Sequence, residues 1–102
     1  MIDVLKTKHE QISDICARHG VARLHVFGSA LHEEARRDES DVDLLVELGP
    51  MDPHARVDAY FGLLEELGAL LNLKIDLVMV GAVKNPYIAR DIERTKQLLY
   101  AA

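Results

Sequence analysis

The sequence has 102 residues, of which 49% are hydrophobic and 28% are charged, and this balance excludes a disordered tail or a fibre. A net charge of −5 argues against direct binding to nucleic acid or to an anionic membrane. The single cysteine, Cys16, excludes an internal disulfide and a cysteine-rich zinc site. The N-terminus lacks the apolar stretch of a secretion signal, so we expect one cytoplasmic domain over residues 1–102 without a membrane segment.

Helical and strand patterns alternate along the first half of the chain. A helix is predicted over residues 2–19, where Gly20 is placed to end it. The apolar residues of its predicted buried stripe are Ile2, Leu5, Ile12, Ile15 and Cys16. Alternation predicts a strand over residues 22–27, after which a short helix can open at Ser29. A charged loop over residues 32–39 then follows.

The second half begins with the best strand of the sequence, over residues 41–47. Asp52 and the following proline then predict the start of a helix. The predicted buried stripe of this helix consists of Val57, Tyr60, Phe61, Leu64, Leu67 and Leu71. A strand over residues 73–80 comes next, and Asn85 with its proline opens a last helix that is expected to reach Leu99. The order α-β-α-β-α-β-α predicts an α/β fold, a small mixed sheet with packed helices.

Two carboxylates lie two residues apart in the strand predicted over residues 41–47. Asp41 and Asp43 project from one face, whereas Val42 between them points toward a core on the other face. A divalent cation removes the repulsion of two adjacent anions, and oxygen ligands without histidine or cysteine favour Mg²⁺ or Mn²⁺. An Asp-x-Asp pair alone is weak evidence, because it occurs often by chance.

A turn formed by Gly28 and Ser29 follows the first predicted strand. Glycine lets the backbone approach a phosphate oxygen, and the serine hydroxyl and free N–H groups at a helix start favour an anion. The alternative is a simple glycine turn with a serine helix cap. Because this turn precedes a strand with two carboxylates, the combination is typical of a site for a metal-bound nucleotide.

Asp76 lies in the middle of the third apolar strand. A carboxylate there is costly to bury unless it is paired or binds a metal. If the second and third strands are neighbours, Asp76 joins Asp41 and Asp43 and can accept a proton from an attacking hydroxyl. The other interpretation is an exposed strand end, with Asp76 paired to Lys74. The five histidines, His25 among them, lack mutual ligand spacing and are expected at the surface or in helix caps.

Together these motifs resemble the minimal nucleotidyltransferases of the DNA-polymerase-β-like superfamily. The matching segments cover most of the chain and are residues 26–29, 40–46, 75–78, 85–88 and 99–100. One departure is that eleven residues, 30–40, separate the glycine-serine turn from Asp41, one more than the family usually has. An inserted loop residue is thermodynamically cheap, so the departure concerns nucleotide affinity and the shape of the entrance rather than the fold.

The resemblance implies a polymerase-β-like fold and a role for each matching residue. Gly28 and Ser29 would hold the triphosphate of ATP, the nucleotide donor. Asp41 and Asp43 would bind two Mg²⁺ ions, for which Mn²⁺ can substitute. Asp76 would be the third acidic ligand and would activate the acceptor hydroxyl.

The resemblance also implies a partner, because small members of this family act as antitoxins of HEPN-domain ribonuclease toxins. We therefore expect a metal-dependent nucleotidyltransferase that transfers AMP to a toxin tyrosine. One alternative is an antitoxin that inhibits its partner by contact alone, and another is nucleotidyl transfer to a small molecule. Val78 and Val80, on the same strand face as Asp76, would be covered by the partner or by helices of the chain itself.

Overall fold

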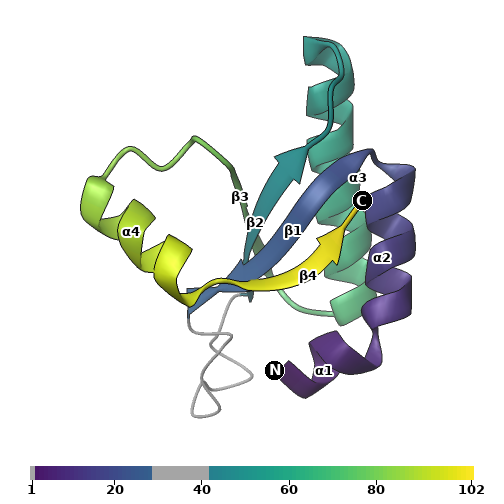
Figure 1. Cartoon of the computed structure of the whole chain (residues 1–102). Coiled ribbons are helices and arrows are strands. Elements are labelled where there is room, and N and C mark those ends of the chain that lie inside the picture. Colours follow the sequence, from purple (N-terminus) through teal and green to yellow (C-terminus); the bar gives the residue numbers. More distant parts are fainter. Residues whose placement is uncertain (1, 29–41) are drawn as a thin grey trace.

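The computed structural model of the chain describes residues 2–28 and 42–102, and these form a four-stranded sheet packed against helices (Figure 1). In chain order the elements are α1 (Ile2–Thr7), α2 (His9–Arg18), β1 (Val21–Phe27), β2 (Val42–Leu48), α3 (Pro53–Leu71), β3 (Ile75–Met79), α4 (Pro86–Thr95) and β4 (Gln97–Ala101). The helix expected to open at Ser29 and the charged loop over residues 32–39 lie outside the described residues.

The sheet is mixed, with the strand order β3-β2-β1-β4. β1 is antiparallel to both β2 and β4, whereas β2 and β3 are parallel and are connected through α3. Among the described residues no helix is long and apolar enough to cross a membrane. The predicted α/β class with a small mixed sheet is confirmed.

The main core lies between one face of the sheet and the helices α2 and α3. Alternate residues of β2 are buried there, as the sequence predicted: Val42, Leu44 and Val46. Because strand side chains alternate between faces, Asp43, Leu45 and Glu47 point to the opposite face. Of the described elements, α4 covers part of that opposite face (Figure 1).

The buried stripe of α3 agrees with the predicted one only in part, since Leu67 and Leu71 are buried as predicted while other predicted members are not. Its buried residues are Ala59, Leu63, Leu67 and Leu71, which recur every four positions. Val57 and Phe61, expected in the core, are 55% and 61% exposed. The apolar residues of α3 occupy most sides of the helix, so more than one buried stripe is compatible with the sequence. Packing against the sheet decides which of these stripes is buried.

The first helix region is divided in two, contrary to the single helix predicted over residues 2–19. Lys8 separates α1 from α2, while the apolar residues Leu5, Ile12, Ile15 and Cys16 are buried as expected. Burial raises the pKa of the Cys16 thiol to about 12. The thiol therefore stays neutral and packs as a small apolar side chain.

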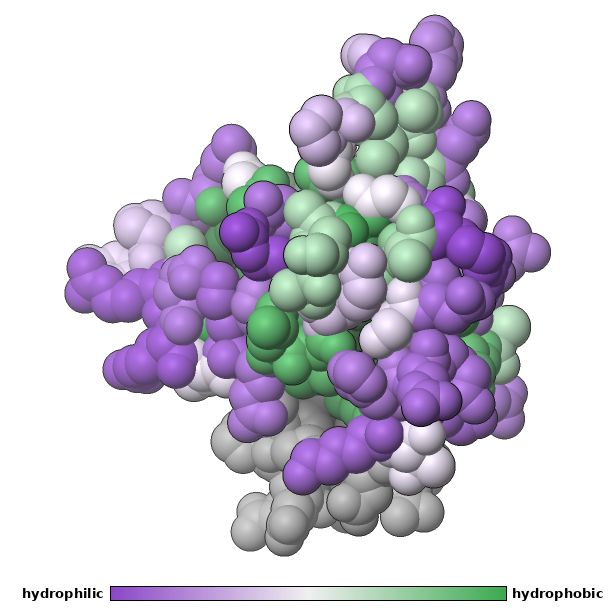
Figure 2. Space-filling view, turned by 45° about the vertical axis from the view of Figure 1, so that its right-hand side comes forward, coloured by the Kyte–Doolittle hydropathy of each residue, from purple (hydrophilic) through white to green (hydrophobic). Residues whose placement is uncertain are grey.

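The chain ends in a strand rather than in the predicted helix. α4 begins where expected, because the Asn85 side chain accepts a hydrogen bond from the Tyr87 N–H at 2.9 Å, but it ends at Thr95. Leu99, predicted in the helix, belongs to β4, an edge strand whose Leu98 is 56% exposed. Periodicity alone cannot assign the short apolar run of β4 to a helix or a strand. In the space-filling view, hydrophobic side chains gather in the middle of one face of the molecule, between hydrophilic ones (Figure 2).

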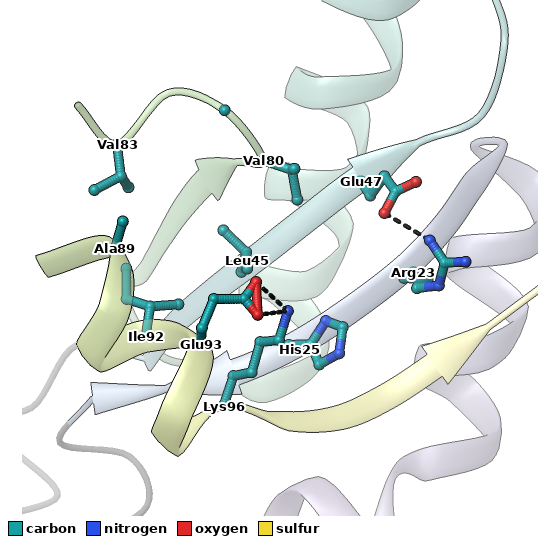
Figure 3. Close-up of a pocket in the computed structure, with 11 residues that line it drawn as sticks. Arg23, His25, Leu45, Glu47, Val80, Val83, Ala89, Ile92, Glu93 and Lys96 are labelled. Atoms are coloured by element: carbon teal, nitrogen blue, oxygen red, sulfur yellow. Dashed lines mark hydrogen bonds and ion pairs between the residues drawn. The ribbon is translucent and has the colours of Figure 1, made fainter. Parts of the chain in front are cut away.

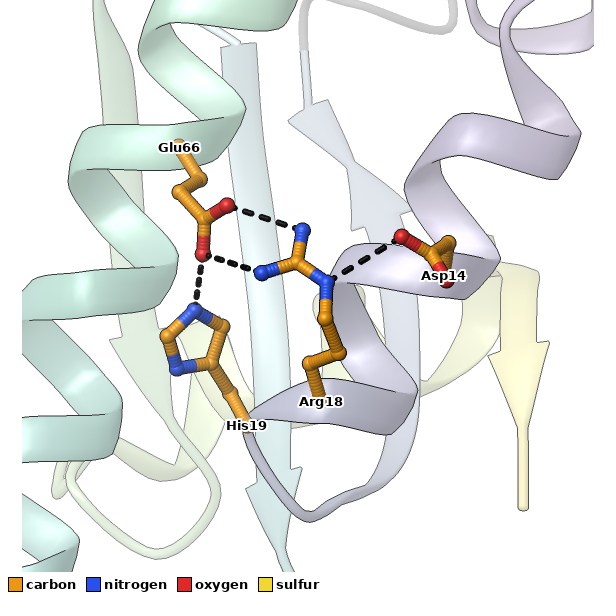
Figure 4. A network of polar contacts seen from close by, with 4 residues as sticks. All are labelled: Asp14, Arg18, His19 and Glu66. Atoms are coloured by element: carbon orange, nitrogen blue, oxygen red, sulfur yellow. Dashed lines mark hydrogen bonds and ion pairs between the residues drawn. The ribbon is translucent and has the colours of Figure 1, made fainter.

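A polar network joins the end of α2 to the middle of α3 (Figure 4). Arg18 Nη2 donates to Glu66 Oε1 at 2.8 Å, and Arg18 Nε donates to Asp14 at 3.1 Å. The His19 ring also contacts the Glu66 carboxylate. The hydrogen bonds from Arg18 and His19 hold the pKa of Glu66 below its ordinary value.

Replacing Glu66 with glutamine is expected to remove a pH-dependent contribution to stability. A depressed carboxyl pKa stabilises the fold above about pH 4.3, the ordinary glutamate value, and this stabilisation is lost as pH falls through the lower folded-state pKa. Denaturant unfolding from pH 7 to pH 3 should show the wild type losing this stability increment while Glu66→Gln does not. Glu65→Gln, on an exposed position of the same helix, is the control and should follow the wild type.

Candidate active site

The candidate site lies where three strands present residues at the same level of the sheet. Phe27 of β1 is the register partner of Asp43, and Asp43 is the register partner of Asp76 on β3. Because adjacent strands lie about 4.8 Å apart, the two carboxylates leave the same face as direct neighbours. β2 and β3 are therefore neighbours, which is the condition under which Asp76 was expected to lie beside Asp43.

The two carboxylates differ in burial. Asp43 is half-buried on the central strand β2, whereas Asp76 is exposed on the edge strand β3. The cost of burial therefore does not explain Asp76, contrary to the argument from its place in an apolar strand. Its register with Asp43 is the observation that singles it out.

Gly28 directly follows β1 and lies against the side chain of Asp43. Its φ of +72° lies in the left-handed region, which residues other than glycine rarely adopt. A Cβ atom at this position would lie 2.4 Å from Asp43 Oδ2. Glycine is thus required for the backbone conformation and for the close approach of the backbone to the carboxylate.

Comparing alanine at Gly28 with alanine at Gly81 separates these two requirements. Gly81 also has a positive φ, of +90°, but its added Cβ would meet no atom of the described residues within 4 Å. We expect Gly81→Ala to lower the free energy of unfolding by about 1–2 kcal/mol, through backbone strain alone. Gly28→Ala should cost more, because Asp43 must also move, and denaturant unfolding measures both variants. Equal costs would contradict the contact.

The described carboxylates suit a hard cation, although they do not complete a metal site. Asp43 and Asp76 offer neighbouring oxygen ligands without histidine or cysteine, the chemistry that Mg²⁺ or Mn²⁺ prefers. Over residues 2–28 and 42–102, no group of three or more potential ligands forms a cation site. Ser29 and Asp41, predicted to hold phosphate and metal, lie outside the described residues.

A cavity of about 530 Å³ lies on the same sheet face as Asp43 (Figure 3). Its residues come from β1, β2, the loop after β3, and α4: Arg23, His25, Leu45, Glu47, Val80, Gly81, Val83, Ala89, Ile92, Glu93 and Lys96. Leu45 and Ile92 are buried here, outside the main core. The face that carries Asp43 thus holds a hollow with an apolar floor.

Two ion pairs lie at the polar side of this cavity. Arg23 donates to Glu47 at 2.8 Å across β1 and β2, and Lys96 donates to Glu93 at 2.8 Å at the end of α4. Figure 3 shows the His25 ring between these two pairs. Exposed pairs of this kind contribute little to stability, so their groups can exchange partners with a ligand at low cost.

His25 is the cavity residue that sequence reasoning missed. It was expected at the surface or in a cap, but it is half-buried in the cavity. Burial, together with the nearby charge of Lys96, lowers the pKa of His25. The neutral ring can both donate and accept a hydrogen bond at pH 7. Its alternation with the buried Leu24 and Val26 was the signal that placed it on the face of Asp43.

Comparison with known proteins places this geometry in context. Residues 9–99 match the family model described as nucleotidyltransferase domain. The chain is 37% identical over 98 residues to a Methanocaldococcus jannaschii protein named "Putative protein adenylyltransferase MJ0128", covering 96% of this chain and 91% of the relative. The similarity therefore extends over nearly the whole of both sequences.

Two solved structures resemble the fold. One, described as "Structure of putative minimal nucleotidyltransferase", is 30% identical with a TM-score of 0.76, covering 93% of this chain and 92% of the other. The second, described as "Crystal structure of the toxin-antitoxin with AMP-PNP", is 20% identical with a TM-score of 0.66, covering 92% and 73%. At that identity the second structure supports the shared fold only.

Proposed function

The chain belongs to the nucleotidyltransferase domain family, and from this premise we propose that it transfers AMP from ATP to a hydroxyl of a partner protein, with Mg²⁺ as the cofactor. The observation that carries the proposal is the register of Asp43 with Asp76, beside the close approach of Gly28. Two neighbouring carboxylates next to a glycine turn are what a metal-bound triphosphate requires.

Each residue of the proposed site has a separate task. Gly28 and Ser29 bind the triphosphate through backbone and hydroxyl groups, and Asp41 and Asp43 hold the cations. Asp76 orients the acceptor hydroxyl and takes its proton. When bound, Mg²⁺ supplies charge neutralisation on the phosphates and lowers the pKa of the acceptor hydroxyl.

The proposed reaction is a substitution at the α-phosphate of ATP. The acceptor oxygen forms a bond to that phosphorus while the bond between it and the bridging oxygen to the β-phosphate breaks. Pyrophosphate leaves with the electron pair of the broken bond, and the acceptor proton passes to Asp76. The exposure of Asp76 at the sheet edge supports this role, because a large acceptor can reach it there.

We propose that the acceptor is a tyrosine of a HEPN ribonuclease toxin and that this chain is its cytoplasmic antitoxin. The relative named for protein adenylylation supports a protein acceptor, and the toxin-antitoxin structure of the same fold supports such a partner. Val80, expected to be covered by the partner or by helices of the chain itself, is 51% exposed and lines the cavity.

The test is to incubate the purified protein with Mg²⁺, ATP and the product of the adjacent gene, and to measure intact masses. We expect the partner to gain the mass of one AMP group and to lose this gain when tyrosine is replaced by phenylalanine. A partner that binds and is inhibited without any gain in mass would replace the enzymatic proposal with an antitoxin that acts by contact.

A further inference from the structure

We propose that the cavity beneath α4 binds the nucleoside part of the donor nucleotide, an inference that rests on the function proposed above. The cavity has no role in the chemistry assigned to Asp43 and Asp76. It nevertheless lies on the same sheet face as these carboxylates, and its lining includes Leu45, two residues beyond Asp43.

The direction of the strands supports this assignment. Gly28, Asp43, Leu45 and Glu47 follow one another along the same face, because Phe27 pairs with Asp43, His25 with Leu45, and Arg23 with Glu47. With a rise of about 3.3 Å per residue, Glu47 lies about 13 Å from Asp43 along β2. A nucleoside whose α-phosphate lies at Asp43 can therefore reach Leu45 and Glu47 along β2.

The chemistry of the cavity suits a nucleoside. A volume of about 530 Å³ is in the ordinary range for small-molecule sites. The buried Leu45 and Ile92 offer an apolar surface to the faces of a base. At the polar side, the Glu47 carboxylate can accept hydrogen bonds from ribose hydroxyls, and the neutral His25 ring can donate to or accept from the base.

The acceptor approaches from a different direction. Asp76, the proposed acceptor base, lies across the sheet from Asp43 on the edge strand β3, whereas the cavity extends along β1 and β2. A protein acceptor reaching Asp76 from the sheet edge leaves the cavity free. The donor nucleoside thus lies along β2 from Asp43, whereas the acceptor approaches across the sheet from β3, so the two occupy separate positions.

The test compares ATP with inorganic tripolyphosphate, which shares the phosphates but lacks the nucleoside. Ala89, on the side of α4 that lines the cavity, is replaced with tryptophan to fill it. Calorimetric titration with Mg²⁺ present should show ATP binding at least about tenfold more weakly to Ala89→Trp, with tripolyphosphate binding changed by less than about twofold.

Two further variants make the result specific. Ala69→Trp introduces the same side chain at an exposed position of α3, away from the cavity, and should bind both ligands like the wild type. Val83→Phe fills the cavity from the loop before α4 and should repeat the selective loss of ATP if Ala89→Trp fails to fold. Thermal unfolding of each variant establishes which ones are folded.

The remaining outcomes overturn the proposal. Unchanged ATP binding in both folded cavity variants, or equal weakening of ATP and tripolyphosphate, would show that the nucleoside lies elsewhere. Unchanged ATP binding with loss of AMP transfer would assign the cavity to the acceptor. A wild-type protein that binds neither ligand would instead overturn the proposed function itself, so the two failures are distinguishable.

Discussion

Asp43→Asn is expected to lower the rate of AMP transfer by about 10³-fold or more, equivalent to about 4 kcal/mol of transition-state stabilisation. Asparagine has nearly the same shape as aspartate but lacks the negative charge that holds the cation. The strand should keep its register, because Val42 and Leu44 on either side remain buried in the core. The measurement is the single-turnover rate of AMP transfer to the partner.

The control is Asp58→Asn, an identical change of charge at an exposed position of α3. It should transfer AMP at the wild-type rate. Unfolding curves of both variants should overlay that of the wild type within about 1 kcal/mol, as expected for changes outside the core. Full activity in a folded Asp43→Asn protein would remove Asp43 from the proposed chemistry.

The largest loss of stability is expected from truncating the core residues of α3 that face the sheet. Leu63→Ala should lower the free energy of unfolding by about 2–5 kcal/mol, through lost apolar burial and the cavity left behind. Leu63 is completely buried, whereas Val57, six residues earlier, is 55% exposed. A domain of this size has a total stability of about 5–15 kcal/mol, so the loss is a large fraction of it.

Val57→Ala is the matched control, because it also truncates an aliphatic side chain of α3. Its effect should stay within about 0.5 kcal/mol of the wild type, the range expected for exposed positions. Urea unfolding monitored by circular dichroism measures both variants. If Val57→Ala cost as much as Leu63→Ala, the stripe predicted from the sequence, rather than the one in the structure, would be the packed face of α3.

The strands that carry the candidate site were predicted well because a short-range signal defines them. On β2, apolar residues at alternate positions determine which face is buried, so the Asp43 side chain must project from the opposite face. The caps of α3 and α4 were equally local: Asp52 accepts from the Ala55 N–H at 2.8 Å, and Asn85 accepts from Tyr87. Such interactions involve residues close in sequence and are therefore visible in it.

The errors concern elements whose state depends on distant partners. Residues 97–101 form a strand because β1 offers them an open edge, with Leu24 pairing with Tyr100. The segment is too short for its own pattern to decide between helix and strand. In the same way, the buried side of α3 is selected by the sheet, which leaves Phe61 exposed.

The sequence by itself determined the α/β class, the face of β2 that carries Asp43, and the family resemblance built on Gly28 and the aspartates. Only the tertiary structure decided that Asp76 is the direct neighbour of Asp43, and that His25 lies in a cavity beneath α4. The physical reason is that alternation and capping are set within a few residues. Strand neighbours and cavities arise from contacts between segments far apart in the chain, which no local pattern specifies.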